Sequence, residues 1–131
     1  MIALLDTHVL VWWFEKPSRL TTAQRGTLRR AGDARSLGVC DITLLEIAQL
    51  VERGRVRLAL PLDEWLSRAT AAPLVDRVGI SPAIAREVAD LQVTRDWDPA
   101  DRVIVASARV LGVPLATSDE RIVGSGLVRT I

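Results

Sequence analysis

Short apolar runs alternate with segments of helical periodicity along most of the chain. The apolar run at residues 2–5 ends at Asp6 and is typical of a strand buried on both faces. Three further strands are expected at residues 36–39, 75–80 and 113–116. Apolar positions spaced three and four residues apart predict helices between these strands. The expected helices cover residues 7–14, 22–31, 42–53, 62–71, 82–91 and 99–111.

This alternation of strands and helices predicts an α/β fold. We expect a mostly parallel central sheet of four to five strands with helices on both faces, in a single domain that spans residues 1–131. The fifth strand would be an edge strand at residues 127–131. Residues 92–97 are expected to form a polar loop, and residues 117–126 a turn-rich connection. Ligands of such folds bind at the carboxyl ends of the strands.

The composition narrows the class of protein. A chain of 131 residues with an apolar fraction of 49% can bury a continuous core without structural cross-links. With one cysteine and one histidine, it can form neither an internal disulfide nor a Cys/His zinc site. No apolar run approaches the roughly twenty residues that cross a bilayer. No basic segment precedes the first apolar run, so we expect a cytoplasmic protein outside the membrane.

Arginine dominates the basic residues. The 17 Lys and Arg residues give a net charge of +1 against 16 Asp and Glu, and Lys16 is the only lysine. A planar guanidinium group can bind two phosphate oxygens. A compositional bias toward arginine explains the count equally well, so the arginines carry little weight in the functional argument.

Two carboxylates follow predicted strands. Asp6 comes immediately after the first strand, and Asp119 comes three residues after the fourth. Both are therefore expected at the edge of the sheet where α/β folds bind ligands. Each also has a structural interpretation, because aspartate is a common helix N-cap and turn residue.

A third carboxylate, Glu46, lies within a helix among apolar residues, with Ile42 and Leu50 one turn away on either side. A carboxylate beside a buried face destabilises the protein unless it is paired or binds a cation. A salt bridge to an arginine is the structural alternative. We favour a functional role for Glu46 because its position is otherwise costly.

Two further carboxylates, Asp98 and Asp101, lie at the start of the last long helix. Asp98 suits the N-cap, Pro99 the first helical position and Asp101 the third, so capping alone explains this segment. The helix dipole also keeps a carboxylate in the first turn ionised, as a metal ligand requires. The neighbouring Arg102 could bind a phosphate or pair with a carboxylate.

Four acidic side chains on four segments form the candidate site: Asp6, Glu46, Asp101 and Asp119. Sites made of oxygen ligands suit Mg²⁺ or Mn²⁺. Such ions stabilise the attacking and leaving oxygens of an in-line displacement at phosphorus. If the fold brings these side chains together, they predict a metal-dependent phosphodiester hydrolase.

Four stretches of sequence carry a more specific signal: LLDTHVLVWW at residues 4–13, LEIA at 45–48, DPADRVIVA at 98–106 and ATSD at 116–119. In order and spacing, these stretches resemble the PIN-domain family over nearly the whole chain. More narrowly, they resemble the VapC-type toxins of bacterial toxin–antitoxin pairs.

The resemblance implies a three-layer PIN fold and an Mg²⁺- or Mn²⁺-dependent endoribonuclease that attacks RNA and stops translation. It also implies neutralisation by a cognate antitoxin protein. Position by position, the four candidate carboxylates match the family's acidic residues, and Thr117 matches its small hydroxyl residue beside the last acid. Asp98 matches a subgroup motif, and we expect it and Arg102 to support the site or bind substrate.

The chain departs from the pattern of its relatives at two places. Where relatives often have a serine near the start of the Glu-bearing helix, this chain has Asp41 or Thr43. The form Trp-Glu-Ile-Ala becomes Leu-Glu-Ile-Ala, with Leu45 at the first position. Neither departure removes a ligand, but the second is expected to alter contacts with a substrate or partner.

The main alternative is a non-enzymatic RNA-binding or regulatory PIN-like protein, and the intact set of acids argues against it. A phosphatase-like or receiver domain also fits poorly. His8 stands where the phosphatase class needs a second aspartate, and Lys16 is too early for the lysine of a receiver. We expect His8 to be a first-turn helix residue rather than a catalytic base.

Trp12 and Trp13 are adjacent on a predicted helix, about 100° apart around its axis. Both side chains therefore cannot point at the same part of the core. We expect one of them to belong to a homodimer or antitoxin surface, with packing at the boundary of the core as the equal alternative.

Overall fold

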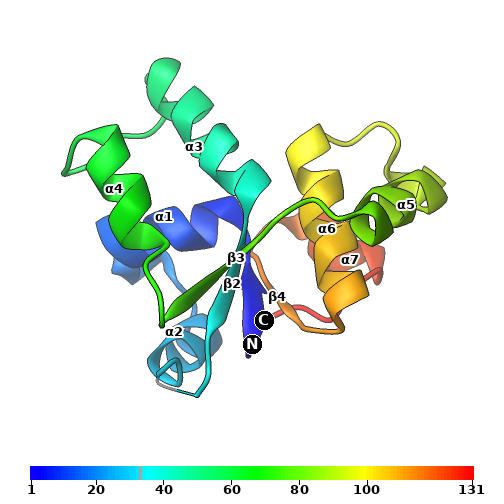
Figure 1. The fold of residues 1–131 in the computed structure, drawn as a ribbon, viewed down its shortest axis with the longest axis horizontal. Helices are drawn as coiled ribbons and strands as arrows, with labels where there is room; N and C mark the ends of the chain where they lie inside the picture. The colour runs from blue at the N-terminus through cyan, green and yellow to red at the C-terminus, as the bar shows by residue number, and fades with distance from the viewer. Residues whose placement is uncertain (33) are drawn as a thin grey trace.

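The computed structural model describes residues 1–32 and 34–131, and a four-stranded sheet lies at its centre (Figure 1). The spatial order of the strands is β3-β2-β1-β4, and every pairing between neighbours is parallel. This arrangement confirms the predicted parallel sheet. The strands are β1 (Ala3–Leu5), β2 (Leu37–Cys40), β3 (Val75–Val78) and β4 (Leu115–Ala116).

Helices cover both faces of this sheet, so the molecule has three layers (Figure 1). Among the described residues, none of the helices is both long and apolar enough to span a bilayer. On one side lie α1 (Thr7–Glu15), α2 (Thr22–Arg29), α3 (Asp41–Glu52) and α4 (Leu62–Ala69), and on the other α5 (Pro82–Asp90), α6 (Pro99–Leu111) and α7 (Glu120–Ser125). Two short 3₁₀ helices, η1 (Pro17–Arg19) and η2 (Gln92–Thr94), complete the chain.

Two apolar clusters fill the space between the layers. Leu5 and Ile47 are fully buried in the first cluster, whereas Leu4 and Ile104 are fully buried in the second. Consecutive strand residues point to opposite faces of a sheet, so Leu4 and Leu5 enter different clusters. The apolar run of β1 is therefore buried on both faces, as its sequence predicts.

Three predictions for the connections were wrong or incomplete. Residues 120–125 form helix α7, which begins after the N-cap Asp119 and ends at Gly126 with a left-handed φ of 67°. The expected polar loop at residues 92–97 contains η2. In place of a fifth strand, Thr130 forms a single parallel bridge with Leu115. Because β4 has two residues, it offers a further strand very little edge to pair with.

A buried glutamine, Gln24 of α2, ties the C-terminal segment to the rest of the fold. Its side-chain Nε2 donates to the carbonyl oxygens of Thr117 at 3.2 Å and Ile131 at 3.1 Å, and to Ser118 Oγ at 3.1 Å. Its Oε1 accepts from the backbone N–H of Thr21 and completes a capping box. One side chain thus begins α2 and holds the segment that follows β4.

We expect Gln24→Leu to lower the free energy of unfolding by about 1–3 kcal/mol, because buried carbonyl oxygens lose their donor. Urea denaturation followed by circular dichroism measures this change. Gln49→Leu is the matched control on the exposed surface of α3, with an expected change within about 0.5 kcal/mol. Equal stability of the two variants would show that Gln24 does not anchor the C-terminal segment.

Candidate functional site

β1 and β4 end side by side, and a candidate residue follows each. Leu5 pairs with Ala116, so Asp6 and Thr117 are neighbours, and Thr117 Oγ1 donates to Asp6 Oδ2 at 2.6 Å. β2 and β3 lie on one side of β1, whereas β4 lies on the other. The direction of strand succession therefore reverses between β1 and β4. Ligand sites of open α/β sheets lie at this reversal.

Asp6 is 5% exposed, and two hydrogen bonds hold its side chain in place. Besides the Thr117 contact, its Oδ1 accepts from the backbone N–H of Thr7 at 2.8 Å and caps α1. Burial raises the pKa of Asp6, while the hydrogen bonds from Thr117 and Thr7 oppose this increase. The carboxylate is therefore rigid and poorly solvated.

Asp119 joins this pair through the same threonine hydroxyl. The backbone N–H of Asp119 donates to Thr117 Oγ1 at 3.1 Å. Its Oδ1 accepts from the backbone N–H groups of Arg121 at 2.9 Å and Ile122 at 3.3 Å, and so caps α7. Oδ2 accepts no hydrogen bond from the described residues. One oxygen of Asp119 has a structural role, and the other is available to a ligand.

Glu46 of α3 and Asp101 of α6 approach this pair from either side of the sheet. Burial raises the pKa of Asp101 to about 7, and the negative charges of Asp6, Glu46 and Asp119 also raise it. Asp6, Glu46 and Asp119 therefore all lie near enough to Asp101 for their charges to act on it, which places the four carboxylates in one region. No cation within the described chain forms an ion pair with Glu46.

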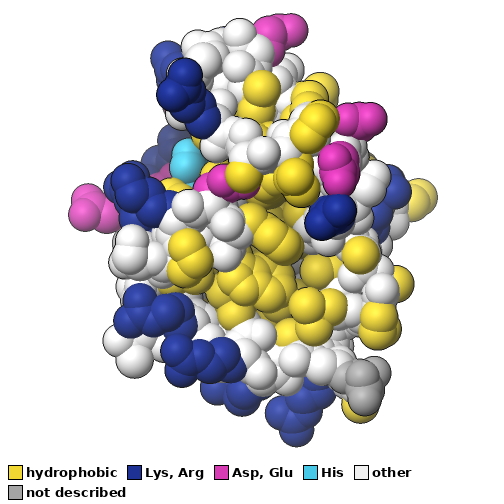
Figure 2. Space-filling model, turned by 90° about the vertical axis from the view of Figure 1, so that its left-hand side faces the viewer, with side chains coloured by type: hydrophobic (Ala, Val, Ile, Leu, Met, Phe, Trp, Pro, Cys, Tyr) yellow, Lys and Arg dark blue, Asp and Glu magenta, His cyan; other side chains and the backbone are white. Residues whose placement is uncertain are grey.

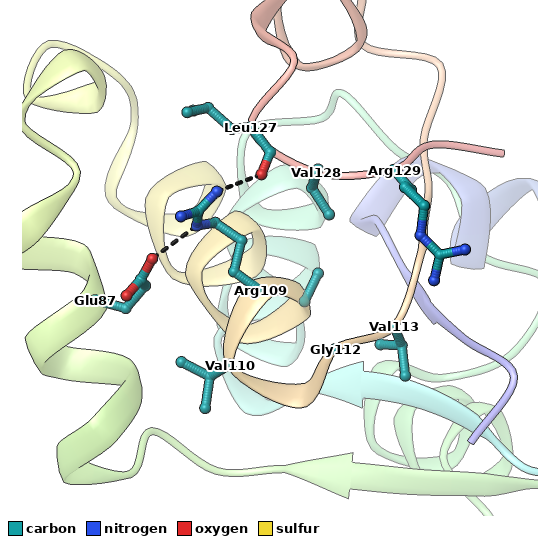
Figure 3. Close-up of a pocket in the computed structure, with 9 residues that line it drawn as sticks. Glu87, Arg109, Val110, Gly112, Val113, Leu127, Val128 and Arg129 are labelled. Atoms are coloured by element: carbon teal, nitrogen blue, oxygen red, sulfur yellow. Dashed lines mark hydrogen bonds and ion pairs between the residues drawn. The ribbon is translucent and has the colours of Figure 1, made fainter.

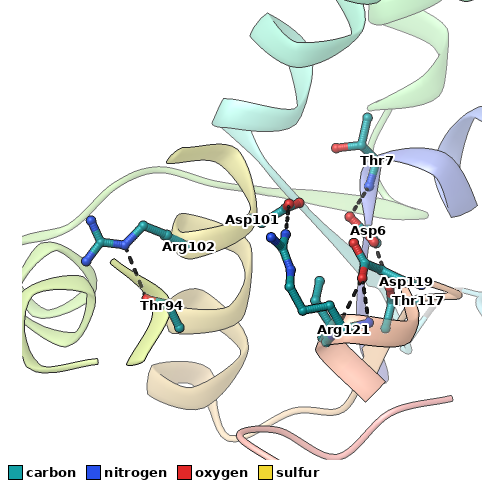
Figure 4. A network of polar contacts seen from close by, with 9 residues as sticks. Asp6, Thr7, Thr94, Asp101, Arg102, Thr117, Asp119 and Arg121 are labelled. Atoms are coloured by element: carbon teal, nitrogen blue, oxygen red, sulfur yellow. Dashed lines mark hydrogen bonds and ion pairs between the residues drawn. The ribbon is translucent and has the colours of Figure 1, made fainter. Parts of the chain in front are cut away.

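Arg121 partly neutralises this cluster, although sequence reasoning missed it. Its Nη2 lies 2.8 Å from Asp101 Oδ2 (Figure 4). Its guanidinium carbon also lies 4.5 Å from the centre of the Trp97 ring. The charge of Arg121 lowers the pKa of Asp101 against the effect of the other acids. Its position two residues after the candidate Asp119 was the available signal.

Arg102 points away from the carboxylates, contrary to its expected role (Figure 4). Its Nε donates to Thr94 Oγ1 at 3.2 Å, and its Nη2 donates to the carbonyl oxygen of Val88 at 3.1 Å. Consecutive helical residues are about 100° apart, so Asp101 and Arg102 face different neighbours. Arg102 connects α6 to the end of α5 and to η2.

Asp98 occupies the N-cap position of α6, yet its side chain makes no capping hydrogen bond within the described structure. It is exposed and lines the same groove as Glu46. Capping therefore does not account for the choice of aspartate at this position. The carboxylate faces the space in front of the site.

The structure also separates Asp41 from Thr43, the two residues considered in place of a serine. Asp41 forms an ion pair with Arg77 of β3 at 2.8 Å. Thr43 is fully buried, and its Oγ1 accepts from Thr7 Oγ1 at 3.3 Å. Thr43 is therefore the hydroxyl residue that connects α3 to the helix beginning beside Asp6.

A separate pocket lies at the carboxyl end of α6 (Figure 3). Glu87 and Arg109 line it and form an ion pair at 2.7 Å, and Arg109 also donates to the carbonyl oxygen of Leu127 at 2.6 Å. None of the four candidate carboxylates lines this pocket. Glu87 and Arg109 bind each other, and their contacts join α5, α6 and the C-terminal segment.

Within the described residues, no three His, Cys, Asp or Glu side chains are already arranged to hold a metal ion. Arg121 occupies one oxygen of Asp101, and Asp6 uses both its oxygens in hydrogen bonds. The four carboxylates are gathered, but a shared ligand would require side-chain rearrangement.

The sequence matches the PIN domain over residues 3–124. The chain therefore belongs to the PIN-domain family, within its VapC-type group. It is 39% identical over 119 residues to Ribonuclease VapC22 from Mycobacterium tuberculosis (strain ATCC 25618 / H37Rv). The match covers 91% of this chain and 88% of that protein.

Solved structures share the fold over almost the whole chain. The crystal structure of VapBC2 from Rickettsia felis bound to a DNA fragment from their promoter matches with a TM-score of 0.75 and 14% identity, covering 100% of this chain and 98% of that chain. A toxin–antitoxin complex from Klebsiella pneumoniae matches with a TM-score of 0.66 and 17% identity, covering 98% and 95%. These matches confirm the predicted PIN-like α/β fold.

We expect Asp101→Asn to stabilise the protein in EDTA at pH 8 by on the order of 2 kcal/mol, and much less at pH 4. The pKa of Asp101 rises from 3.8 to about 7 on folding. A carboxyl group whose pKa rises on folding stabilises the protein at pH values below its pKa in the unfolded state. This stabilisation is lost as the pH rises through its pKa in the folded state, which is about 7. Asparagine removes that loss.

Urea denaturation at the two pH values measures the difference. Asp96→Asn, at an exposed position outside the cluster, is the control and should change stability equally at both. If Asp101→Asn destabilises the protein at pH 8 as much as at pH 4, repulsion within the cluster is not a significant energetic term.

Proposed function

We propose that this protein is an Mg²⁺- or Mn²⁺-dependent endoribonuclease and the toxin of a toxin–antitoxin pair. The observation that carries this proposal is the gathering of four carboxylates where strand order reverses in a PIN-domain sheet. The relative named Ribonuclease VapC22 supports RNA as the substrate. Cleavage of RNA by the toxin would inhibit translation.

The donor set fits a hard divalent cation. The four carboxylates supply oxygen ligands, which Mg²⁺ and Mn²⁺ prefer. The negative charge that raises the pKa of Asp101 is the charge that a bound cation would offset. The ligands would be Asp6, Glu46, Asp101 and Asp119. When bound, the ion supplies a water molecule of lowered pKa and stabilises negative charge on the phosphate.

The residues around these ligands fix their positions. Thr117 donates to Asp6 and accepts from the backbone of Asp119, so one hydroxyl group orients two of the four acids. Asp98 lies at the outer side of the site, where it contacts substrate. Because water rather than the RNA 2′-hydroxyl attacks, the products carry 5′-phosphate and 3′-hydroxyl ends.

Arg121 takes the role that the sequence assigned to Arg102. Its guanidinium group already lies beside Asp101, and its side chain is 45% exposed. A guanidinium group in this place can bind a phosphate oxygen when Asp101 binds a cation. Arg121 therefore offsets charge on the acids in the free protein and on the phosphate during cleavage.

The partners and location follow from the same assignment. The structurally similar VapBC2 complex and the toxin–antitoxin complex from Klebsiella pneumoniae support an antitoxin as partner. A broad apolar surface on the side of α1, α2 and α4 is a suitable place for such a protein (Figure 2). Phe14 of α1 is 44% exposed. We also assign the protein to the cytoplasm, and the homodimer stays a prediction.

The experiment that tests this function is cleavage of a labelled RNA pool with Mg²⁺, with Mn²⁺ and with EDTA. We expect metal-dependent cleavage, and a loss of about a hundredfold or more in Asp6→Asn and Asp119→Asn, because each removes a ligand. Asp96→Asn is the matched control. Ligation-dependent sequencing of the products identifies 5′-phosphate ends, whereas 2′,3′-cyclic phosphates would contradict the attack by water.

Cleavage that both variants retain would indicate a contaminant or a different site. If antitoxin-free, folded protein binds RNA but cleaves none of the pool, the alternative of a non-enzymatic RNA-binding protein becomes the better explanation. Circular dichroism of each variant shows whether the fold is intact.

Arg121, which contacts Asp101, and Arg102, which follows it in the sequence, give a second test. We expect Arg121→Gln to reduce kcat by roughly tenfold to a hundredfold, because the phosphate loses a cation. Arg102→Gln should change kcat by less than about threefold, since Arg102 binds Thr94 and Val88 instead. Arg121→Lys should restore part of the rate. The opposite order of effects would return the phosphate contact to Arg102.

A further inference from the structure

Arg121 is the counter-ion of the carboxylate cluster in this structure (Figure 4). Its Nη2 lies 2.8 Å from Asp101 Oδ2, and the Asp101 side chain is only 14% exposed. Apart from Arg121, no cation among the described residues forms an ion pair with any of the four candidate carboxylates. The guanidinium group therefore holds a place at the acids that a divalent cation would need.

The other acids offer little alternative to Asp101. Both oxygens of Asp6 are engaged in hydrogen bonds, and one oxygen of Asp119 caps α7. An oxygen of Asp101 that accepts from Arg121 is not available to an ion. Two cations within about 4–6 Å of each other also repel, most strongly where water is scarce. A divalent cation and the paired guanidinium group therefore compete for Asp101.

The side chain of Arg121 can leave Asp101 without a change in the backbone. It is 45% exposed, and its guanidinium group forms one ion pair and no other hydrogen bond within the described residues. The backbone N–H of Arg121 donates to Asp119 Oδ1 at 2.9 Å, so the first turn of α7 stays attached to the site. A rotation of the side chain is enough to free Asp101.

Trp97 favours the paired position of the guanidinium group. The Arg121 guanidinium carbon lies over the Trp97 ring, 4.5 Å from its centre, and a cation in this place is attracted by the face of the ring. Trp97 is half-buried and packs against the second apolar cluster. Its backbone N–H donates to the carbonyl oxygen of Thr94 at 2.9 Å. The ring is therefore a fixed support for a side chain that moves.

We propose that Arg121 is an internal competitor of the divalent cation, which binds Asp101 only when the guanidinium group has left it, and that Trp97 is the positioning residue that favours the paired state. The apparent affinity for the ion is then lowered by the fraction of molecules in which Asp101 is free. The inference rests on the proposed metal-dependent function. It adds the side-chain exchange that sets the affinity for the metal.

Isothermal titration calorimetry with Mn²⁺, in the absence of RNA, tests this competition. We expect Arg121→Gln to bind Mn²⁺ about tenfold more tightly than the unsubstituted protein, because Asp101 no longer has a competing partner. Arg102→Gln is the matched control, since it removes the same charge next to Asp101 in the sequence but from a side chain that contacts Thr94 and Val88. Its affinity should change by less than about threefold.

Trp97→Leu should bind Mn²⁺ about twofold to fivefold more tightly, because the paired guanidinium group loses its support. Trp97→Phe keeps an aromatic face and should have a smaller effect. In a protein that already carries Arg121→Gln, adding Trp97→Leu should leave the affinity unchanged, because Trp97 acts through Arg121. A purely structural role of Trp97 would change metal binding equally in both backgrounds.

Thermal unfolding provides a second readout. A fixed concentration of Mn²⁺ should raise the Tm of Arg121→Gln by more than that of the unsubstituted protein, since tighter binding to the folded state stabilises it further. Circular dichroism shows whether each variant is folded. Arg121→Gln is also expected to cleave RNA more slowly, so tighter metal binding with a lower kcat separates the two roles of Arg121.

Three results would overturn the proposal: equal affinity for Mn²⁺ in Arg121→Gln and Arg102→Gln, weaker or absent binding in folded Arg121→Gln, or an effect of Trp97→Leu that persists without Arg121. The ribonuclease assignment is tested separately, because no RNA is present in these titrations. Tighter binding of Mn²⁺ to Arg121→Gln without metal-dependent cleavage of RNA would support the competition and contradict the ribonuclease function.

Discussion

Repulsion among four carboxylates is the constraint on which the rest of this structure depends. Burial, together with the charges of the other three acids, raises the pKa of Asp101 to about 7 and so opposes the folded state at neutral pH. Three features limit this cost: the Thr117 hydroxyl on Asp6, the backbone N–H groups on Asp119, and the Arg121 guanidinium on Asp101. Each donates a hydrogen bond to one of the carboxylates and so offsets part of the cost of gathering them.

Two of the carboxylates that we propose as metal ligands also have structural roles. Asp6 and Asp119 cap helices, which from the sequence was the alternative to a functional role. A helix N-terminus presents N–H groups and a positive dipole, so it holds a carboxylate in place and favours its ionised form. A metal ligand needs both properties. Capping by one oxygen is therefore compatible with the proposed role of these carboxylates as ligands.

The sequence predicted the sheet and the position of the acids because both depend on strong local patterns. Continuous apolar runs identify buried parallel strands, and the ends of those strands determine where Asp6 and Asp119 lie. It failed for α7, whose six residues are too few to show helical periodicity. It also expected Arg102 to face the site and gave Arg121 no role, because tertiary packing decides which side of α6 and of α7 faces the carboxylates.

The groove that Glu46 and Asp98 line shows how one constellation of acids can serve different substrates. All RNAs share the phosphodiester group beside which the carboxylates would act. Selection among RNAs therefore has to come from residues farther from the carboxylates. Leu45, which is 54% exposed, lies in the groove where relatives often have tryptophan. The aromatic groups of the groove are therefore His8 and Trp12, both on α1. The α1 side of the groove is therefore aromatic, whereas the α3 side at Leu45 is aliphatic.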